Sequence, residues 1–335
     1  MFIRGMIASL LMLAPFAAQA QVPDTVTFAP PSPRTDTYPA HMAKFGGGVT
    51  GIPDIVYASY SGYRPLTLDL YLPPEGSRPN PLVIYAHGGS FHAADSRFIL
   101  GIDDFPAALA SLAARGYAVA SVNYRLSGEA HFPAQIQDVK AAIAFLRANA
   151  AKYHIDPARA VAWGVSSGGQ LAALVAESCG KAEFAPLPSN SRPILPDVAR
   201  VQAAHVSDCV QGAVIWYGDM DLNREAPDPA LEPFLGCSPC GKAELAATSP
   251  INFVTTATPP MLLVNGIADP AIPVAEAAAM ARRLTEAGVP VQTLLIPDVG
   301  HGFIGKTPEI TRAANARALA RTAEFIDALF SKAAK

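Results

Sequence analysis

Apolar and polar positions along this chain predict strands and helices that alternate from about residue 55 to the C-terminus. Residues 66–72 place Leu66, Leu68 and Leu70 on one face, which is the period of a strand. The run at 81–86 is continuously apolar, as expected for a strand that is buried on both faces. The other predicted strands occupy residues 55–58, 117–122, 160–164, 210–217, 261–264 and 291–296.

Helical periodicity fills most of the intervals between these strands. Ile136, Val139 and Ile143 recur at three- and four-residue spacing after Pro133, which suits the first turn of a helix. The predicted helices occupy residues 105–115, 133–151, 168–178, 274–287 and 308–335, and a turn is expected at Asp156-Pro157. Strands that alternate with such helices predict an α/β fold, with a mostly parallel central sheet and helices on both faces.

The length and composition agree with one α/β domain. The chain has 335 residues, of which 50% are hydrophobic and 16% charged, and this excludes a disordered or fibrous protein. We expect the domain to span residues 51–335, with a Pro- and Cys-containing insertion at about 180–248. Residues 21–50 are rich in Pro, Thr and Gly without any period, and they predict an extended N-terminal arm.

The first twenty residues have the form of a secretory signal peptide. Arg4 precedes an apolar run at 6–18, and Ala18-Gln-Ala20 supplies small residues at a cleavage site. The alternative is a membrane anchor, but the run is short for a span of about 20 residues. We therefore expect cleavage after Ala20, a secreted or periplasmic protein, and no membrane association afterwards.

Charge and cysteine content narrow the function classes further. The net charge of −3 without a basic cluster argues against a nucleic-acid partner. The four cysteines are Cys179, Cys209, Cys237 and Cys240, and an even number after an export signal favours disulfides. The expected pairs are Cys179 with Cys209 and Cys237 with Cys240, although sequence alone does not fix connectivity. A redox motif at 237–240 is disfavoured because no strand precedes it.

The strongest local motif is Gly164-Val-Ser-Ser-Gly168, which lies between a predicted strand and a predicted helix. This context is the one that a nucleophile elbow requires, because the chain must turn sharply around small residues. Ser166 is therefore the candidate nucleophile. The backbone N–H of Ser167, at the start of the helix, is a candidate oxyanion donor.

A second glycine-rich turn, His87-Gly-Gly-Ser-Phe91, follows the buried strand at 81–86. Such a turn can direct backbone N–H groups at one point, and the oxyanion of ester hydrolysis needs donors of this kind. Gly89 and Ser90 are the candidate donors beside Ser167. His87 is expected to brace the turn.

The candidate base and its carboxylate also follow predicted strands. His301 lies between two glycines just after the last strand, and Asp269 follows the strand at 261–264. The order Ser166, Asp269, His301 is the one that α/β hydrolases use, and all three residues would meet at one edge of a parallel sheet. The competing acids are Asp219, Asp221 and Asp298, with Asp219 the runner-up. His92 and His131 are candidates for lining a substrate cleft.

These motifs together resemble a known family. They are His87–Phe91, Val122–Leu126, Phe132–Gln135 with Asp138, Ile155–Pro157, Gly164–Gly169 and Gly300–Phe303. Over roughly residues 50–330, the chain resembles α/β-hydrolase esterases of the bifunctional feruloyl and acetyl-xylan esterase type, near the hormone-sensitive-lipase-like carboxylesterases. The resemblance implies the triad and oxyanion donors named above. The chain departs from the lipase-like pattern at Ser90, where a third glycine is usual, and lacks evident N-terminal cap helices.

The sequence therefore predicts a serine esterase that cleaves carboxylic esters of short acyl, acetyl or feruloyl groups through an acyl-enzyme, without a metal or organic cofactor. The expected partner is a small-molecule or polysaccharide-linked ester. One alternative is a serine exopeptidase or amidase, because residues 249–303 also resemble the catalytic domains of prolyl oligopeptidases. Another is a non-catalytic, hydrolase-like binding protein.

Overall fold

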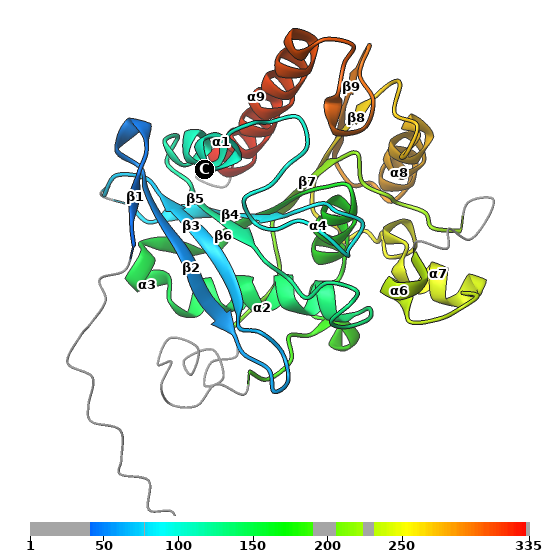
Figure 1. Cartoon of the computed structure of the whole chain (residues 1–335), viewed down its shortest axis with the longest axis horizontal. Helices are drawn as coiled ribbons and strands as arrows, with labels where there is room; N and C mark the ends of the chain where they lie inside the picture. Colours follow the sequence, from blue (N-terminus) through cyan, green and yellow to red (C-terminus); the bar gives the residue numbers. More distant parts are fainter. Residues whose placement is uncertain (1–40, 77, 190–205, 224–230, 333–335) are drawn as a thin grey trace, which may run out of the picture. The chain divides into compact units, whose positions relative to one another are not determined.

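The computed structural model describes residues 41–76, 78–189, 206–223 and 231–332, and nine strands in these ranges form one sheet (Figure 1). Across the sheet the strands are β1 (Ala43–Lys44), β2 (Thr50–Ala58), β3 (Leu66–Leu72), β5 (Ala118–Val122), β4 (Asn80–Ala86), β6 (Ile155–Val165), β7 (Gly212–Trp216), β8 (Met261–Gly266) and β9 (Val291–Ile296). From β5 to β9 all neighbours are parallel, whereas β1, β2 and β3 add an antiparallel edge.

Helices follow most of the parallel strands. The α-helices are α1 (Phe105–Ala113), α2 (Ala134–Ala148), α3 (Ala150–Tyr153), α4 (Ser167–Glu177), α6 (Glu232–Leu235), α7 (Lys242–Thr248), α8 (Val274–Glu286) and α9 (Pro308–Lys332). Short 3-10 helices are η1 (Gly46–Gly48), η2 (Ala182–Phe184), η4 (Pro250–Asn252) and η5 (His301–Phe303). Among the described residues, no helix combines the length and apolar character that crossing a membrane requires.

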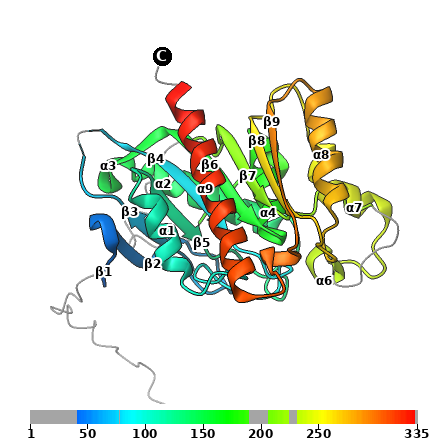
Figure 2. The same cartoon turned by 90° about the horizontal axis from the view of Figure 1, so that it is seen from above.

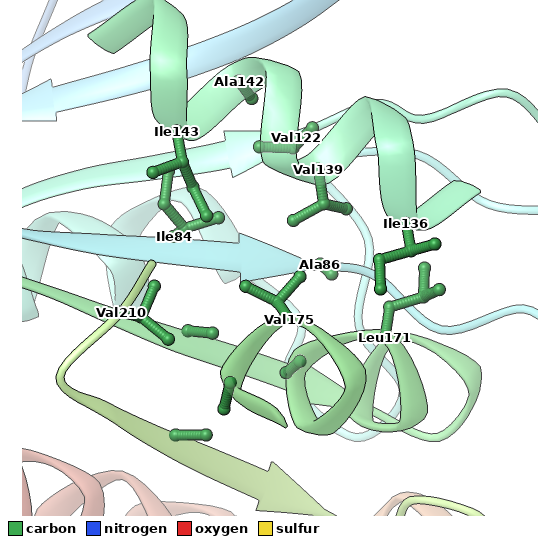
Figure 3. Packing of buried hydrophobic residues seen from close by; sticks show 14 of the residues in the cluster. Ile84, Ala86, Val122, Ile136, Val139, Ala142, Ile143, Leu171, Val175 and Val210 are labelled. Carbon is green, nitrogen blue, oxygen red and sulfur yellow. The ribbon is translucent and has the colours of Figure 1, made fainter. Parts of the chain in front are cut away.

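The sheet separates two hydrophobic cores. Along β4, Ile84 faces the core formed with α2, α4 and α8, while the next residue, Tyr85, faces the core formed with α1 and α9. Figure 3 shows Ile143 of α2 above Ile84 and Val139 above Ala86, and Figure 2 shows α1 and α9 together on the opposite face. Since β4 is buried on both sides, its continuously apolar sequence is explained. The predicted fold class is confirmed.

The sheet begins earlier than the sequence pattern indicates. Residues 43–50, assigned above to the end of an extended arm, instead contain β1, η1 and the first residue of β2. Ala43 pairs with Gly51, and the intervening glycines make the reversal, with Gly47 and Gly48 in the left-handed region at φ 69° and 76°. A pairing of two residues is too short to leave a periodic signal. The predicted signal peptide and residues 21–40 lie outside the described residues.

The Asp156-Pro157 segment was also assigned incorrectly, because it forms part of β6 and does not precede it. Between Ile155 and Ala160 the register against β4 shifts, which marks a bulge. The Asp156 carboxylate accepts from the Ala158 N–H at 2.8 Å and pairs with Arg159, so the side chain satisfies backbone that the ladder leaves open. The turn-like residues therefore bend the strand without ending it.

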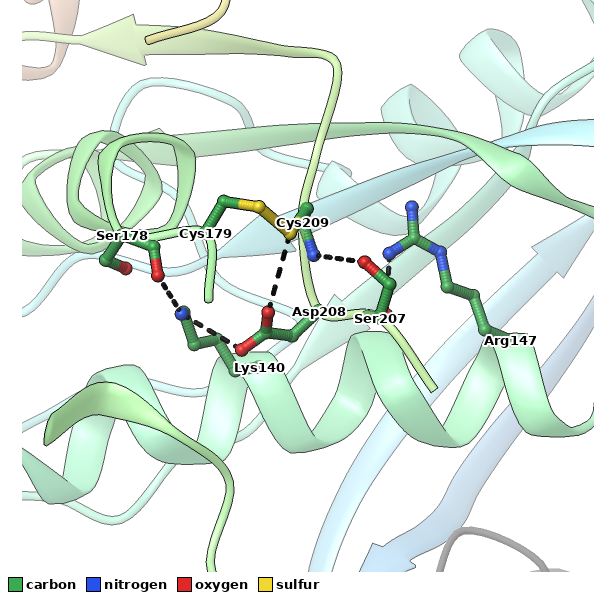
Figure 4. The surroundings of a disulfide bond; sticks show 7 residues. All are labelled: Lys140, Arg147, Ser178, Cys179, Ser207, Asp208 and Cys209. Carbon is green, nitrogen blue, oxygen red and sulfur yellow. Dashed lines mark hydrogen bonds and ion pairs between the residues drawn. A yellow bond between two sulfur atoms is a disulfide. The ribbon is translucent and has the colours of Figure 1, made fainter. Parts of the chain in front are cut away.

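The interval 180–248 is not a single insertion, because β7, which is a strand of the central sheet, lies in the middle of this interval. The excursions before and after β7 each contain one disulfide, Cys179–Cys209 and Cys237–Cys240, in the expected pairing. Figure 4 shows the first bond beside α2. Lys140 of α2 donates to the Ser178 carbonyl at 2.7 Å and pairs with the Asp208 carboxylate at 2.9 Å. One buried ammonium thus joins the residues that precede the two cysteines.

Candidate active site

A sharp turn between β6 and α4 presents Ser166. Its backbone lies at φ 53° and ψ −125°, a conformation that costs a non-glycine residue free energy. The turn requires glycine on both sides: a Cβ on Gly164 would lie 2.0 Å from the Gly168 carbonyl oxygen, and one on Gly168 would lie 2.1 Å from the Ala86 carbonyl oxygen. The Ser166 N–H donates to the Trp216 carbonyl at 2.9 Å, which fixes the turn to β7.

The structure brings the predicted serine, histidine and aspartate into one hydrogen-bonded row. His301 in η5 places Nε2 3.0 Å from Ser166 Oγ and Nδ1 2.9 Å from Asp269 Oδ2. The Asp269 side chain is buried, and its other oxygen accepts from the N–H groups of Ala271 and Ile272, both at 2.9 Å. Because the carboxylate is held from two sides, it fixes the proton on Nδ1 and leaves Nε2 to accept from the serine.

The predicted oxyanion donors lie beside the same hydroxyl. Gly89 and Ser90 adopt left-handed backbone, with φ 112° and 51°, and a Cβ on Gly89 would lie 2.2 Å from the Ala93 carbonyl oxygen. Within the described residues, no hydrogen bond uses the backbone N–H of Gly89, Ser90 or Ser167. Three amide donors are therefore available to a negatively charged oxygen at this point.

His87 braces the turn that carries these donors. Its Nδ1–H donates to the Gly88 carbonyl at 2.6 Å, and its ring stacks on Tyr124 with 4.3 Å between the ring centroids. The Tyr124 hydroxyl donates to the His87 carbonyl at 2.8 Å. Burial lowers the pKa of His87 to about 4, so its imidazole is neutral at pH 7 and acts as a hydrogen-bond donor without charge.

Tyr217 is a site residue that sequence reasoning missed. It follows β7 directly, its φ is 39°, and its ring packs against the His301 ring at 4.8 Å with 64° between the planes. Burial, and next the Asp269 carboxylate, raise the pKa of its hydroxyl above the ordinary range. Its place after a strand at the carboxyl edge, shared with the other site residues, is the signal that could have identified it.

Two cavities open beside the Ser166–His301–Asp269 row and share Ser90, Ser166 and His301. The first, of about 200 Å³, is also lined by Phe98, Ile99, Leu100, Val165, Tyr217 and the two glycines of the oxyanion turn. The second, of about 240 Å³, is also lined by Phe91, Ser167, Gln170, Asp219, Leu231, Ala271 and Ile272. A carbonyl carbon at Ser166 can therefore place one substituent in each cavity.

The competing residues do not take the place of Asp269 beside His301. Asp219 lines the second cavity, while the bond to His301 Nδ1 comes from Asp269. Asp298 occupies a left-handed turn position with φ 61°. His131 is bonded to the Pro233 carbonyl at 2.7 Å, and neither it nor His92 lines the two cavities.

Comparisons with known proteins agree with the α/β-hydrolase fold. A family model described as BD-FAE matches residues 68–284. Esterase LipQ of Mycobacterium tuberculosis is 31% identical over 260 residues, which cover 75% of this chain and 56% of that protein, so the chain spans little more than half of this relative.

Two solved structures share the fold at 27% and 29% identity. A truncated carbohydrate esterase from gut microbiota superposes with a TM-score of 0.65 over 83% of this chain and 95% of that one. A bifunctional GH43-CE protein of Bacteroides eggerthii superposes with a TM-score of 0.67 over 83% of this chain and 35% of that one. With the family match covering most of the described sheet, the chain belongs to the BD-FAE family and has the α/β-hydrolase fold.

Proposed function

We propose that this chain is a secreted or periplasmic carboxylic ester hydrolase that works through an acyl-enzyme on Ser166. The observation that carries the proposal is the row in which His301 Nε2 lies 3.0 Å from Ser166 Oγ and Nδ1 lies 2.9 Å from Asp269. In this geometry, Ser166 is the nucleophile, His301 is the base and Asp269 orients the base.

In the first half of the reaction, His301 Nε2 takes the proton of Ser166 while Oγ attacks the ester carbonyl carbon. The Asp269 carboxylate, already held by two backbone N–H groups, stabilises the imidazolium that forms. The amides of Gly89, Ser90 and Ser167 stabilise the oxyanion, and each such donor contributes about 3 kcal/mol in well-studied enzymes. His301 then donates its proton to the departing alcohol.

In the second half of the reaction, water enters the position that the alcohol has left and approaches the acyl-enzyme from there. His301 takes a proton from this water, and the hydroxide adds to the acyl carbon with the same three amides on the oxyanion. Collapse of the intermediate releases the acid and returns the proton to Ser166. The chain's own residues complete this cycle without a cofactor.

Export is supported by two independent features. The signal-like residues 1–20 carry the expectation, and the bonds Cys179–Cys209 and Cys237–Cys240 are of a kind that persists in oxidising compartments. Mass analysis of protein recovered outside the cytoplasm tests this part: a first residue of Gln21 supports cleavage, and an intact Met1 refutes it.

For substrates, we propose esters of short acyl, acetyl or feruloyl groups. The similarity to a carbohydrate esterase favours ester groups carried by polysaccharide, and the small cavities favour small substituents. Methyl ferulate, acetylated xylan and p-nitrophenyl acetate, assayed side by side, separate these classes.

The decisive experiment replaces the nucleophile. The Ser166→Ala variant should remain folded, lose hydrolysis of p-nitrophenyl acetate and lose labelling by a fluorophosphonate probe. Ser111→Ala, which removes an exposed hydroxyl on α1, is the matched control and should keep both activities. Undiminished turnover in Ser166→Ala would reject the assignment. Efficient cleavage of dipeptide anilides without ester cleavage would favour the peptidase alternative, and wild-type protein without labelling would favour a binding protein.

A further inference from the structure

The two cavities beside Ser166 differ in chemistry. Apart from the shared Ser90, Ser166 and His301, the first cavity is lined only by glycine backbone and by apolar or aromatic side chains. The second cavity presents the Gln170 amide and the Asp219 carboxylate. An uncharged apolar group loses little on entering the first cavity, whereas a charged group would give up its hydration there without a counter-ion.

Resting on the ester hydrolase function proposed above, we propose that the first cavity binds one uncharged, apolar substituent of the ester, and that Phe98 and Leu100 determine which substituents are accepted. Both side chains line the cavity and remain partly open to solvent, at 53% and 44% exposure. They therefore form an apolar mouth to a cavity whose inner wall is Val165 and Tyr217, both buried.

The size of the cavity limits the group that fits. Its volume is about 200 Å³, and a dry apolar cavity of about 150 Å³ is known to accept benzene. A phenyl ring or a chain of about six carbons therefore fills the space. A longer chain has to emerge between Phe98 and Leu100, where it still covers apolar surface.

The two mouth residues are not equivalent. Leu100 also packs on the loop of the catalytic histidine, since a Cβ on Gly302 would lie 2.6 Å from a Leu100 methyl carbon. Replacing Leu100 would disturb His301 as well as the cavity. Phe98 is better suited to a test by substitution, because its side chain lines the mouth of the cavity and is more exposed than that of Leu100.

The test measures kcat/KM by pH-stat titration for two ester series that share ethyl acetate. One series lengthens the acid, as ethyl butanoate and ethyl hexanoate, and the other lengthens the alcohol, as butyl and hexyl acetate. In the wild type, kcat/KM should rise at least about tenfold from the shortest to the longest member of one series. Phe98→Ala should reduce that ratio about three- to tenfold, and Phe98→Asp should reduce it further because it places a charge at the mouth.

Leu295→Ala is the control, because Leu295 is another large apolar residue, 42% exposed, that lines neither cavity. A reduced ratio in the acid series assigns the cavity to the acyl group, and in the alcohol series to the alkoxy group; either supports the proposal. Chain-length profiles that are flat in the wild type, or that Phe98→Ala and Phe98→Asp leave unchanged, overturn it. Loss of the proposed function would look different: no ester would be cleaved and no fluorophosphonate would label Ser166.

Discussion

The edge of the sheet around Ser166 and the interior under α2 differ in whether their polar groups are paired within the protein. At the edge, Ser90, Ser166 and Tyr217 hold left-handed backbone, and the amide donors beside Ser166 have no partner among the described residues. Under α2, the buried guanidinium of Arg125 meets the Asp138 carboxylate through two hydrogen bonds of 2.8 and 2.7 Å.

This difference supports the proposal that the edge of the sheet is the active site. Strain and unused donors cost stability, and they persist where the surrounding packing fixes them and a reacting group uses them. Paired buried charges, in contrast, are satisfied within the protein and leave nothing for a substrate. Changes at the edge should therefore alter turnover far more than stability, and changes under α2 should do the reverse.

The largest expected effect is on turnover at the edge. Asp269→Asn keeps the shape of the side chain but cannot hold the proton on His301 Nδ1 as a carboxylate does, so kcat for p-nitrophenyl acetate should fall by about 10⁴-fold. The thermal midpoint, measured by circular dichroism, should change by only a few degrees. A fall in kcat below tenfold would remove Asp269 from the catalytic row and return attention to Asp219.

The next effect is on stability under α2. Asp138→Ala leaves the Arg125 guanidinium buried without its partner, since the two side chains are only 4% and 0% exposed. The free energy of unfolding in urea should fall by about 3–5 kcal/mol. The double variant with Arg125→Met removes the stranded charge and should recover part of that loss. Equal losses in the single and double variants would contradict the pairing argument.

A smaller effect at the edge concerns how His301 is aimed. Tyr217→Ala removes the ring that packs 4.8 Å from the imidazole, and a looser base should lower kcat about 10- to 100-fold with little change in KM. Tyr217→Phe keeps the ring and should stay within about threefold of the wild type. If Phe and Ala at this position lower kcat equally, the hydroxyl matters and the packing argument fails.

The sequence predicted the parts of the molecule that depend on local pattern. The alternation at 66–72 located β3 correctly, because one apolar face must be buried, and the glycines around Ser166 identified the sharp turn. It did not predict β1, whose two residues carry no period, or the bulge in β6, where Asp156 satisfies the backbone. The packing of Tyr217 on His301 and the two cavities arise from segments that only the tertiary structure brings together.

The smallest expected effect comes from a buried acidic residue of α4 that, unlike Asp138, has no hydrogen-bond partner within the described ranges. Glu177, in the last turn of α4, is buried, and neither carboxyl oxygen has a hydrogen-bond partner within the described ranges. Burial raises the pKa of Glu177 well above its ordinary value, and the positive charge of Arg283 opposes the shift only in part. The folded protein therefore keeps this proton at a pH where the unfolded chain has lost it.

Because the folded state binds the proton more tightly, the protonated carboxyl contributes its full stability below the unfolded pKa. That contribution declines as the pH rises toward the folded pKa, by about 1 kcal/mol per pH unit. Glu177→Gln removes the titration, so its free energy of unfolding relative to the wild type should rise by about 1 kcal/mol between pH 5 and pH 6. Exposed Glu309→Gln is a control for the loss of one carboxyl on a helix. A difference between Glu177→Gln and the wild type that stays constant over this range would mean that Glu177 has a charge partner in the folded protein.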